Sequence, residues 1–231
     1  MALKVTRIVD QQIKAWSYRN SQGKPVRSET SIVPVITISR EFGARGAALA
    51  GVLNQKIDFK IWDKEILQAI ATELGSDQKL LKTLDERRQQ VVEDTVAGFM
   101  DHIYTNVSYL KSLIRVVKTI EEHGKSIIVG RGANYICQHP GSLHLRIVSP
   151  FKKRVEDYAS KEKLSLHESR RIIREKDRER AEFIKENFLR DVSNASDYDL
   201  IINSNTYSLE QATDMVLDAY EMKTGLKTSN S

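Results

Sequence analysis

The sequence predicts an α/β fold: a three-layer sandwich in which helices cover both faces of a five-stranded, mostly parallel sheet. Five short segments are continuous β-branched and apolar runs instead of alternating ones, as in strands buried on both faces. Segments with helical periodicity separate these runs, and such alternation is typical of a parallel sheet. The 231 residues, 40% apolar and 29% charged, have the composition of a globular protein and are long enough to bury a core.

The elements follow in order along the chain. Residues 1–18 carry apolar side chains at helical spacing and predict an amphipathic helix, and residues 19–34 predict a polar linker. Strands are predicted at residues 34–39, 58–63, 125–130, 142–149 and 198–204. Helices are predicted at 46–56, from about 64, at 150–163, 165–189 and 209–223, with a helix-rich stretch at 76–124. We expect the first helix to dock on the domain or to form a homodimer contact, because its polar face is too weakly basic for a membrane surface.

Composition and targeting signals favour a cytoplasmic protein. No apolar run approaches the roughly 20 residues that span a bilayer, and the amino terminus lacks the features of a signal peptide. The single cysteine, Cys137, excludes an internal disulfide framework and suits a reducing compartment. We expect no membrane partner.

The net charge of +5 is concentrated in one segment. Residues 146–190 contain 14 Lys and Arg against 9 Asp and Glu, whereas the rest of the chain balances at 22 against 22. A local excess of positive charge predicts an anionic ligand. The alternative is an ordinary solvated helix face.

Polar residues directly follow each predicted strand. They are residues 39–41, 63–65, 130–132, Ser149 and 203–204. Ligands of parallel sheets bind beyond the carboxyl ends of the strands. The sequence therefore predicts one polar crevice at that edge.

The order and spacing of several motifs resemble the cytidylate kinase-like family, a branch of the nucleoside monophosphate kinases in the P-loop class. These motifs are "SREFGARG", "WDKE", "IIVGRGANYI", "DRERA" and "YDLIINS", within residues 35–220. The resemblance implies a P-loop kinase-like domain over 35–224, with a helical insertion at 76–124, a helical lid at 165–190 and a tail at 225–231. It also implies ATP and Mg²⁺ as cofactors, with the metal held mainly through phosphates and water.

The glycine turn after the first strand departs from the family pattern. Gly46 occupies the position of the usual lysine, and Ala47 and Ala48 stand where a hydroxyl would help to hold magnesium. The resemblance assigns donor-nucleotide binding to Arg40, Gly43, Ala44, Arg45, Gly46 and Ala47. Glycine geometry and a helix amino terminus remain available for backbone N–H contacts with phosphate. We expect Arg45, or else Arg40, to supply the missing charge; the alternative is a turn without a ligand.

Four further residues receive roles from the resemblance. Arg131 would grip the acceptor phosphate, Asp177 the acceptor side, Arg180 the phosphates, and Arg154 matches another arginine of the lid region. For Arg131 the alternative is a surface arginine, and for the lid residues it is ordinary salt bridging along a helix.

Asp63 lies where the family has a residue near the acceptor nucleoside, although capping of the next helix explains it equally well. The five histidines show no metal-ligand spacing, so no metal-ligating side chain is predicted.

The resulting functional hypothesis is ATP-dependent phosphoryl transfer to a nucleoside monophosphate of cytidylate type, or to a related small phosphate acceptor, by an enzyme with a degenerate phosphate-binding loop. The alternative is a catalytically weak or inactive nucleotide-binding regulator, which the missing lysine and hydroxyl favour. Nucleic acid is not an expected partner, because the basic segment lacks a recognition motif and stacking aromatic residues.

Overall fold

The structure is a computed structural model that describes residues 32–72, 75–100 and 107–228, together with Arg7, Asp10, Gln11 and Lys14. The predicted helix at 1–18, with its homodimer contact, falls outside the described residues except for those four positions. Most of the predicted linker and the last three residues also fall outside them. The chain divides into two compact units, one of Met1–Val33 and Trp62–Gly124, the other of Pro34–Ile61 and Lys125–Ser231.

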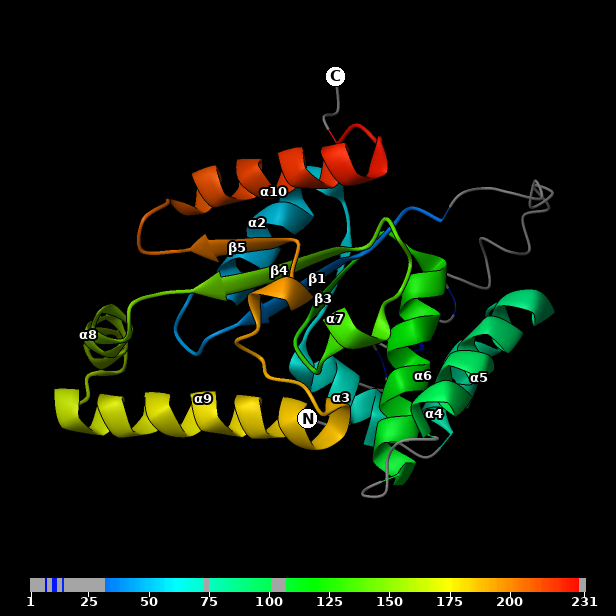
Figure 1. Ribbon diagram of the computed structural model, residues 1–231, viewed down its shortest axis with the longest axis horizontal. Coiled ribbons are helices and arrows are strands. Elements are labelled where there is room, and N and C mark those ends of the chain that lie inside the picture. Colours follow the sequence, from blue (N-terminus) through cyan, green and yellow to red (C-terminus); the bar gives the residue numbers. More distant parts are fainter. Residues whose placement is uncertain are drawn as a thin grey trace. The chain divides into compact units, whose positions relative to one another are not determined.

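The five predicted strands form one parallel sheet, which confirms the α/β fold class (Figure 1). The strands are β1 (Ile36–Arg40), β2 (Lys60–Trp62), β3 (Ser126–Val129), β4 (Leu143–Val148) and β5 (Leu200–Asn203), in the spatial order β2-β3-β1-β4-β5. On the central strand, Ile38 pairs with Val129 of β3 and Leu145 of β4. These side chains are almost completely buried, as the continuous apolar runs predict.

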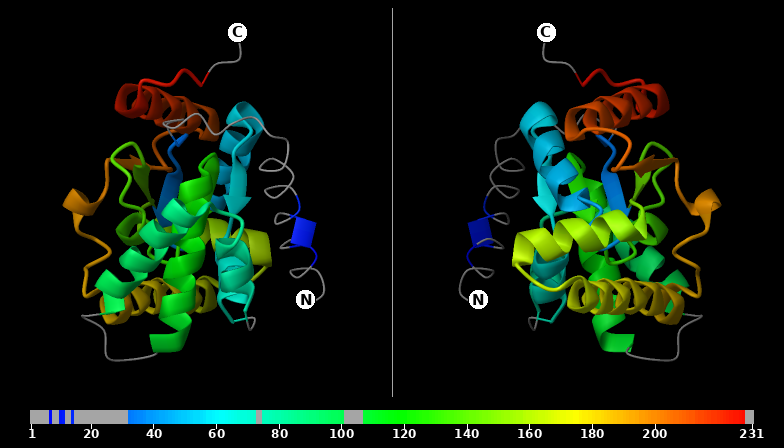
Figure 2. Two further views of the ribbon diagram at one scale, coloured as in Figure 1. Left: turned by 90° about the vertical axis from the view of Figure 1, so that its right-hand side faces the viewer. Right: turned by 90° about the vertical axis from the view of Figure 1, so that its left-hand side faces the viewer.

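Two helices of the second unit pack side by side against the sheet (Figures 1 and 2). They are α2 (Gly46–Ile57) and α10 (Leu209–Thr224). Helix α10 begins with a capping box between Ser208 and Gln211, which satisfies backbone N–H groups at its amino end. Tyr220 of α10 is buried and donates a hydrogen bond to the carbonyl of Pro34 at 2.7 Å. This contact fixes the helix to the chain segment that enters β1.

Two helices follow β4 and pack against each other: α8 (Phe151–Glu162) and α9 (Leu166–Phe188). The Ser165 hydroxyl caps α9 by accepting a hydrogen bond from the Glu168 backbone N–H. Ile173 and Ile184 of α9 are buried.

The first unit is helical over the stretch expected to be rich in helices. Its helices are α3 (Lys64–Thr72), α4 (Ser76–Leu81), α5 (Glu86–Met100) and α6 (Val107–His123). Arg115 of α6 is buried and pairs with Asp77 at 2.5 Å and Glu93 at 2.6 Å. Burial lowers the pKa of Arg115, but the two carboxylates raise it by more. None of the described helices is long and apolar enough to span a membrane.

A short helix, α7 (Ala133–Ile136), begins just beyond β3, in a stretch for which no helix is predicted. Gly130, Arg131 and Gly132 all have positive φ, at 85°, 55° and 69°. A Cβ on Gly132 would lie 2.2 Å from the Phe188 ring, so glycine is required there by both backbone and packing. The turn ends β3 sharply and presents Arg131 at the carboxyl edge of the sheet.

Candidate functional site

The turn between β1 and α2 has the glycine geometry that the sequence predicts. Gly43 and Arg45 adopt positive φ, at 81° and 62°, and α2 starts immediately afterwards at Gly46. Ala44 is buried, and a Cβ on Gly43 would lie 3.5 Å from the Cβ of Arg154, so the turn rests on the stem of that arginine. The first backbone N–H groups of a helix have no partner within the helix and favour anions.

The side chain of Arg40 fills the space that the side chain of a lysine at position 46 would need. A Cβ on Gly46 would lie 2.9 Å from the Cβ and 3.1 Å from the Cγ of Arg40, so the arginine stem fills that space. The Arg40 guanidinium extends to β3, where a Cβ on Gly130 would lie 2.1 Å from its Nη1. Arg40 therefore points toward the end of β3, whereas Arg45 and Ala47 are exposed at the start of α2.

We expect two glycines of α2 to respond oppositely to alanine. Gly46→Ala should lower the free energy of unfolding by about 1–2 kcal/mol, because the new Cβ overpacks against Arg40. Gly51→Ala should raise it by about 0.5–1 kcal/mol, because nothing lies within 4 Å of a Cβ there and alanine favours a helix. Urea denaturation followed by circular dichroism measures both. Equal effects at the two positions would show that Arg40 does not fill the space beside Gly46.

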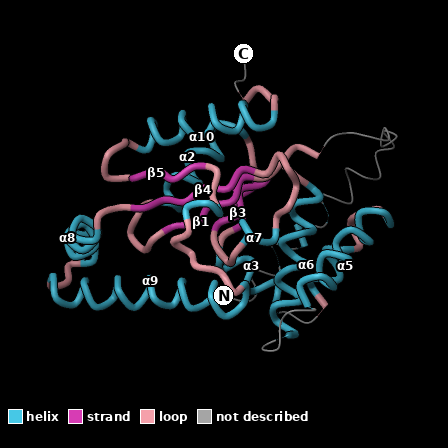
Figure 3. Tube along the Cα trace, viewed as in Figure 1, coloured by secondary structure: helices cyan, strands magenta, loops and turns pink. Residues whose placement is uncertain are grey.

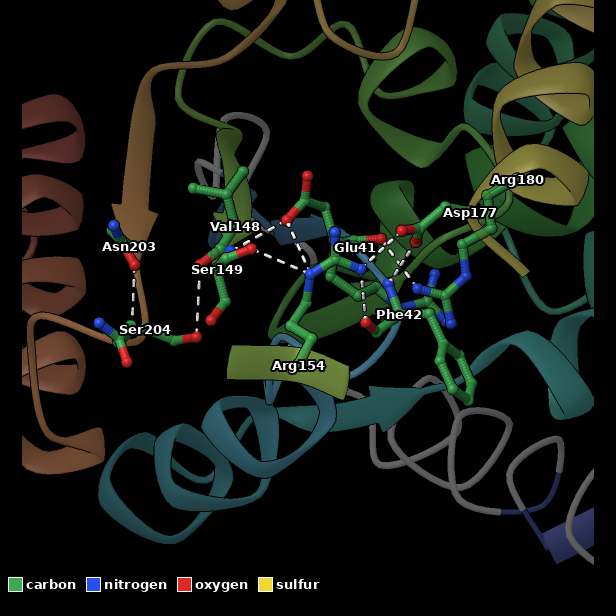
Figure 4. Close-up of polar contacts among 11 residues, drawn as sticks. Glu41, Phe42, Val148, Ser149, Arg154, Asp177, Arg180, Asn203 and Ser204 are labelled. Atoms are coloured by element: carbon green, nitrogen blue, oxygen red, sulfur yellow. Dashed lines mark hydrogen bonds and ion pairs between the residues drawn. The ribbon is translucent and has the colours of Figure 1, made fainter. Parts of the chain in front are cut away.

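Asp177 of α9 and Arg154 of α8 bind each other and the β1–α2 turn (Figure 4). Asp177 Oδ1 accepts a hydrogen bond from the Phe42 backbone N–H at 2.7 Å, and its Oδ2 lies 2.6 Å from Arg154 Nη1. The same Nη1 donates to the Phe42 carbonyl at 2.9 Å. Both carboxylate oxygens of Asp177 are thus engaged within the protein. In this structure Asp177 and Arg154 hold the turn, and their contacts with an acceptor stay a prediction.

Glu41 links the same arginine to the end of β4. Its Oε2 accepts a hydrogen bond from the Ser149 backbone N–H at 2.9 Å and lies 3.4 Å from Arg154 Nε. Arg154 Nε also donates to the Ser149 carbonyl at 2.9 Å. Only 5% of the Arg154 side chain is exposed, so its charge is neutralised by Glu41 and Asp177 and not by solvent.

Arg180 is a residue of α9, and Arg131 packs against the same helix. Arg180 Nη1 donates to the carbonyl of Arg40 at 2.9 Å, and its guanidinium lies 5.3 Å from the centre of the Phe42 ring. Arg131 stacks its guanidinium over Phe183, one helical turn further along α9, at 4.8 Å. The structure thus brings Arg40, Arg131 and Arg180 to the ends of β1 and β3.

Asp63 belongs to the first unit, where it caps α3. Its Oδ1 accepts a hydrogen bond from the Ile66 backbone N–H at 2.9 Å. This is the capping role that the sequence offered as an alternative, and a contact with substrate stays a prediction.

A hollow of about 260 Å³ opens beside the glycine turn. It is lined by Gly43, Arg45, Ser149, Lys153, Asp157 and residues 204–208. The last group forms the loop that leads from β5 into α10, and Figure 3 shows this loop and the one after β4 leaving the same edge of the sheet. Ser204 is fixed there by its backbone N–H, which donates to the Val148 carbonyl at 2.9 Å. The lining is polar, and Arg45 and Lys153 make it suitable for an anionic ligand.

Some residues around the site were predicted and others were not. Glu41, Ser149 and Ser204 belong to the polar set that the sequence places directly after the strands, whereas residues 205–208 lie further along the loop and were not predicted. Phe42 contributes backbone atoms, which leave no trace in residue type. Arg146 is a buried charge inside the apolar strand 143–148, a pattern that is visible in the sequence.

Comparison with solved structures concerns the fold alone. The structure resembles that of an uncharacterized protein from Eubacterium ventriosum, with a TM-score of 0.66 and 19% identity over 82% of this chain and 98% of that one. TT1252 from Thermus thermophilus shows a TM-score of 0.40 and 16% identity over 81% of this chain and 98% of that one. No protein with curated function matches the chain.

The sequence itself gives the most specific match. Residues 35–206 match the cytidylate kinase-like family, a range that includes the glycine turn, Arg131, Arg154, Asp177, Arg180 and most of the loop lining the hollow. A family of this kind indicates nucleotide kinase activity in general. The match covers three quarters of the chain, and the chain has the parallel sheet expected for the fold. This chain belongs to the cytidylate kinase-like family.

Proposed function

We propose that the chain transfers the terminal phosphoryl group of ATP to a nucleoside monophosphate of cytidylate type. The observation that carries the proposal is the contact between Arg180 and Arg40, in which the α9 guanidinium donates to the carbonyl at the end of β1 at 2.9 Å. This contact brings a lid arginine to the strand end from which the glycine turn departs. Positive charge at that point suits a phosphoryl group in transfer.

The hollow beside Gly43 supports a donor site. Its volume of about 260 Å³ is slightly below the roughly 300–1,000 Å³ typical of small-molecule pockets. Arg45 and Lys153 offer cations to the donor phosphates, and the backbone N–H groups at the start of α2 offer hydrogen bonds. Arg45 thereby takes the electrostatic part that a lysine has in related loops.

The turn after β3 supports an acceptor site on the other side of Arg40. Arg131 is held there by its stacking on Phe183, and a planar guanidinium binds two phosphate oxygens at once. In the transfer step a phosphate oxygen of the acceptor attacks the terminal phosphorus of ATP, and the bond from that phosphorus to the bridging oxygen of ADP breaks. The protein positions both groups in line and neutralises charge, and no covalent intermediate is needed.

Magnesium would be held mainly by the donor phosphates and water. Asp157 is the carboxylate among the lining residues of the hollow, and it is paired with Lys153 at 2.7 Å. Bound Mg²⁺ would neutralise charge on the phosphate oxygens of the donor. A single paired carboxylate fits a metal that keeps several waters, as magnesium does.

The test is a coupled assay of ADP formation with ATP, Mg²⁺ and each nucleoside monophosphate in turn. We expect turnover that is highest with a cytidine nucleotide and that falls by about 10²–10³-fold in kcat/KM in Arg131→Met. Methionine keeps an unbranched stem against Phe183 and removes the charge. Arg178→Met is the matched control, because Arg178 is an exposed arginine of α9 paired only loosely with Glu182 at 3.7 Å.

The outcomes separate the enzyme from its alternative. Turnover that is lost in Arg131→Met and kept in Arg178→Met supports the kinase. ATP binding without turnover of any monophosphate contradicts it and favours a nucleotide-binding regulator, which the absence of lysine and hydroxyl side chains at Gly46 and Ala47 also suggests.

A further inference from the structure

Arg146 on β4 is a buried cation, and no acid among the described residues forms an ion pair with it. The residue is 8% exposed, and its Nη1 donates to Ser39 Oγ on the neighbouring strand at 3.1 Å. Its guanidinium lies 5.6 Å from the centre of the Tyr198 ring. Within the residues that the structure describes, Arg146 takes part in no ion pair. Burying an uncompensated charge is unfavourable, so this position calls for an anion.

The described groups that are hydrogen-bonded to Arg146, directly or through Ser39, are neutral. The Tyr198 hydroxyl lies 2.8 Å from the Val192 carbonyl and 3.3 Å from Ser39 Oγ. A carbonyl can only accept, so the single tyrosine proton goes to Val192 and Ser39 donates in the second contact. The chain of bonds therefore runs from the arginine through two hydroxyls to a backbone carbonyl, and every member after the arginine is neutral.

The acidic residues near this segment are engaged elsewhere. Asp191 accepts two hydrogen bonds from Ser193, which lower its pKa, and Arg146 adds only a smaller effect of the same sign. Asp197 accepts a hydrogen bond from Tyr135 at 3.2 Å. Burial, and after it the neighbouring Tyr198, raises the pKa of Tyr135, so that this ring stays neutral.

Strand geometry puts Arg146 on the strand neighbouring β1, whose other neighbour, β3, leads into the turn that contains Arg131. Ser39 and Arg146 are partners in the register of β1 and β4. Ile38 and Arg40 face α2, as their closeness to Gly46 shows, so Ser39 and Arg146 lie on the opposite face of the sheet. The Gly130 backbone N–H donates to the Ile38 carbonyl at 3.0 Å, which brings the turn containing Arg131 beside Ser39.

We propose that Arg146, positioned by Ser39 and Tyr198, forms an anion subsite that binds the phosphate of the acceptor together with Arg131. The inference deepens the proposed kinase function and rests on it for the identity of the ligand. The subsite itself is defined by a buried, uncompensated guanidinium, and its ligand class is a phosphomonoester.

The test uses the full chain and inorganic phosphate as the probe, titrated against chloride at constant ionic strength. We expect phosphate to raise the melting temperature of the wild type, and Arg146→Met to weaken its binding by about 10- to 100-fold. Without phosphate, Arg146→Met should melt no lower than the wild type, because it removes an uncompensated charge. A merely structural arginine would give the reverse: a lower melting temperature and unchanged phosphate binding.

Two further measurements keep the test decisive. Arg171→Met is the control, since Arg171 is exposed on α9, and it should behave as the wild type. If Arg146→Met does not fold, ¹⁵N-arginine NMR on the wild type replaces it: phosphate should shift the Nε–H resonance that is missing from Arg146→Lys. No shift of that resonance, or no phosphate binding to the wild type, overturns the subsite.

Turnover assayed in parallel separates the two proposals. Arg146→Met should raise the KM of the acceptor and leave the KM of ATP unchanged. Phosphate binding that depends on Arg146 in a protein without turnover would uphold the subsite and refute the kinase. Turnover with an unchanged acceptor KM in Arg146→Met would uphold the kinase and refute the subsite.

Discussion

Arg154→Met is expected to weaken α8 and α9 against local opening by about 3 kcal/mol, because it leaves two carboxylates and two carbonyls without their shared donor. The guanidinium of Arg154 contacts Asp177, Glu41, the Phe42 carbonyl and the Ser149 carbonyl, and the side chain is 5% exposed. Methionine retains an unbranched stem against Gly43. The loss therefore reports on the polar contacts and not on packing.

Hydrogen exchange of the native protein, followed by mass spectrometry, measures this effect unit by unit. Peptides from α8 and α9 should exchange about 100-fold faster in Arg154→Met than in the wild type. Peptides from α6, which belongs to the first unit, are the internal control and should not change. Arg171→Met provides the control for loss of an exposed arginine. Exchange of α9 within about twofold of the wild type would mean that Arg154 does not hold α9 to the turn.

Local sequence signals were sufficient to predict most of the fold. Most of the strands are short β-branched and apolar runs, which are typical of strands buried on both faces, although Ile201 of the edge strand β5 is exposed. The helix predicted at residues 165–189 corresponds to α9, in which Ile173 and Ile184 are buried. The short α7 was not predicted, because it depends on three consecutive residues with positive φ and on the packing of Gly132 against Phe188.

The sequence indicates where polar residues follow the strands, but not which of them contact one another. Arg154 and Asp177 stand 23 residues apart, and only the packing of two helices brings them into contact at 2.6 Å. The crowding of Gly46 by Arg40 likewise depends on backbone geometry, so the sequence shows that the lysine is absent without showing why. The hollow depends on the loop at 204–208, which carries no motif of its own.

A bisubstrate analogue is expected to bind far more tightly than either nucleotide alone. In such a compound, adenosine and cytidine are joined 5′ to 5′ by a polyphosphate. Joining two ligands makes the second binding event intramolecular, which raises affinity by about 10²-fold or more when both sites are within reach. Arg45 lines the hollow on one side of Arg40, and Arg131 lies beyond Gly130 on the other. One polyphosphate should therefore contact both arginines.

Calorimetric titration of the wild type with this analogue and Mg²⁺ tests the shared crevice most directly. The expected result is one molecule bound per chain, with a dissociation constant about 100-fold or more below those of ATP and of cytidine monophosphate. Arg45→Met and Arg131→Met should each remove most of that gain, and Arg178→Met should keep it. An analogue that binds no more tightly than the better of the two nucleotides would contradict a single crevice in which arginines replace the missing lysine.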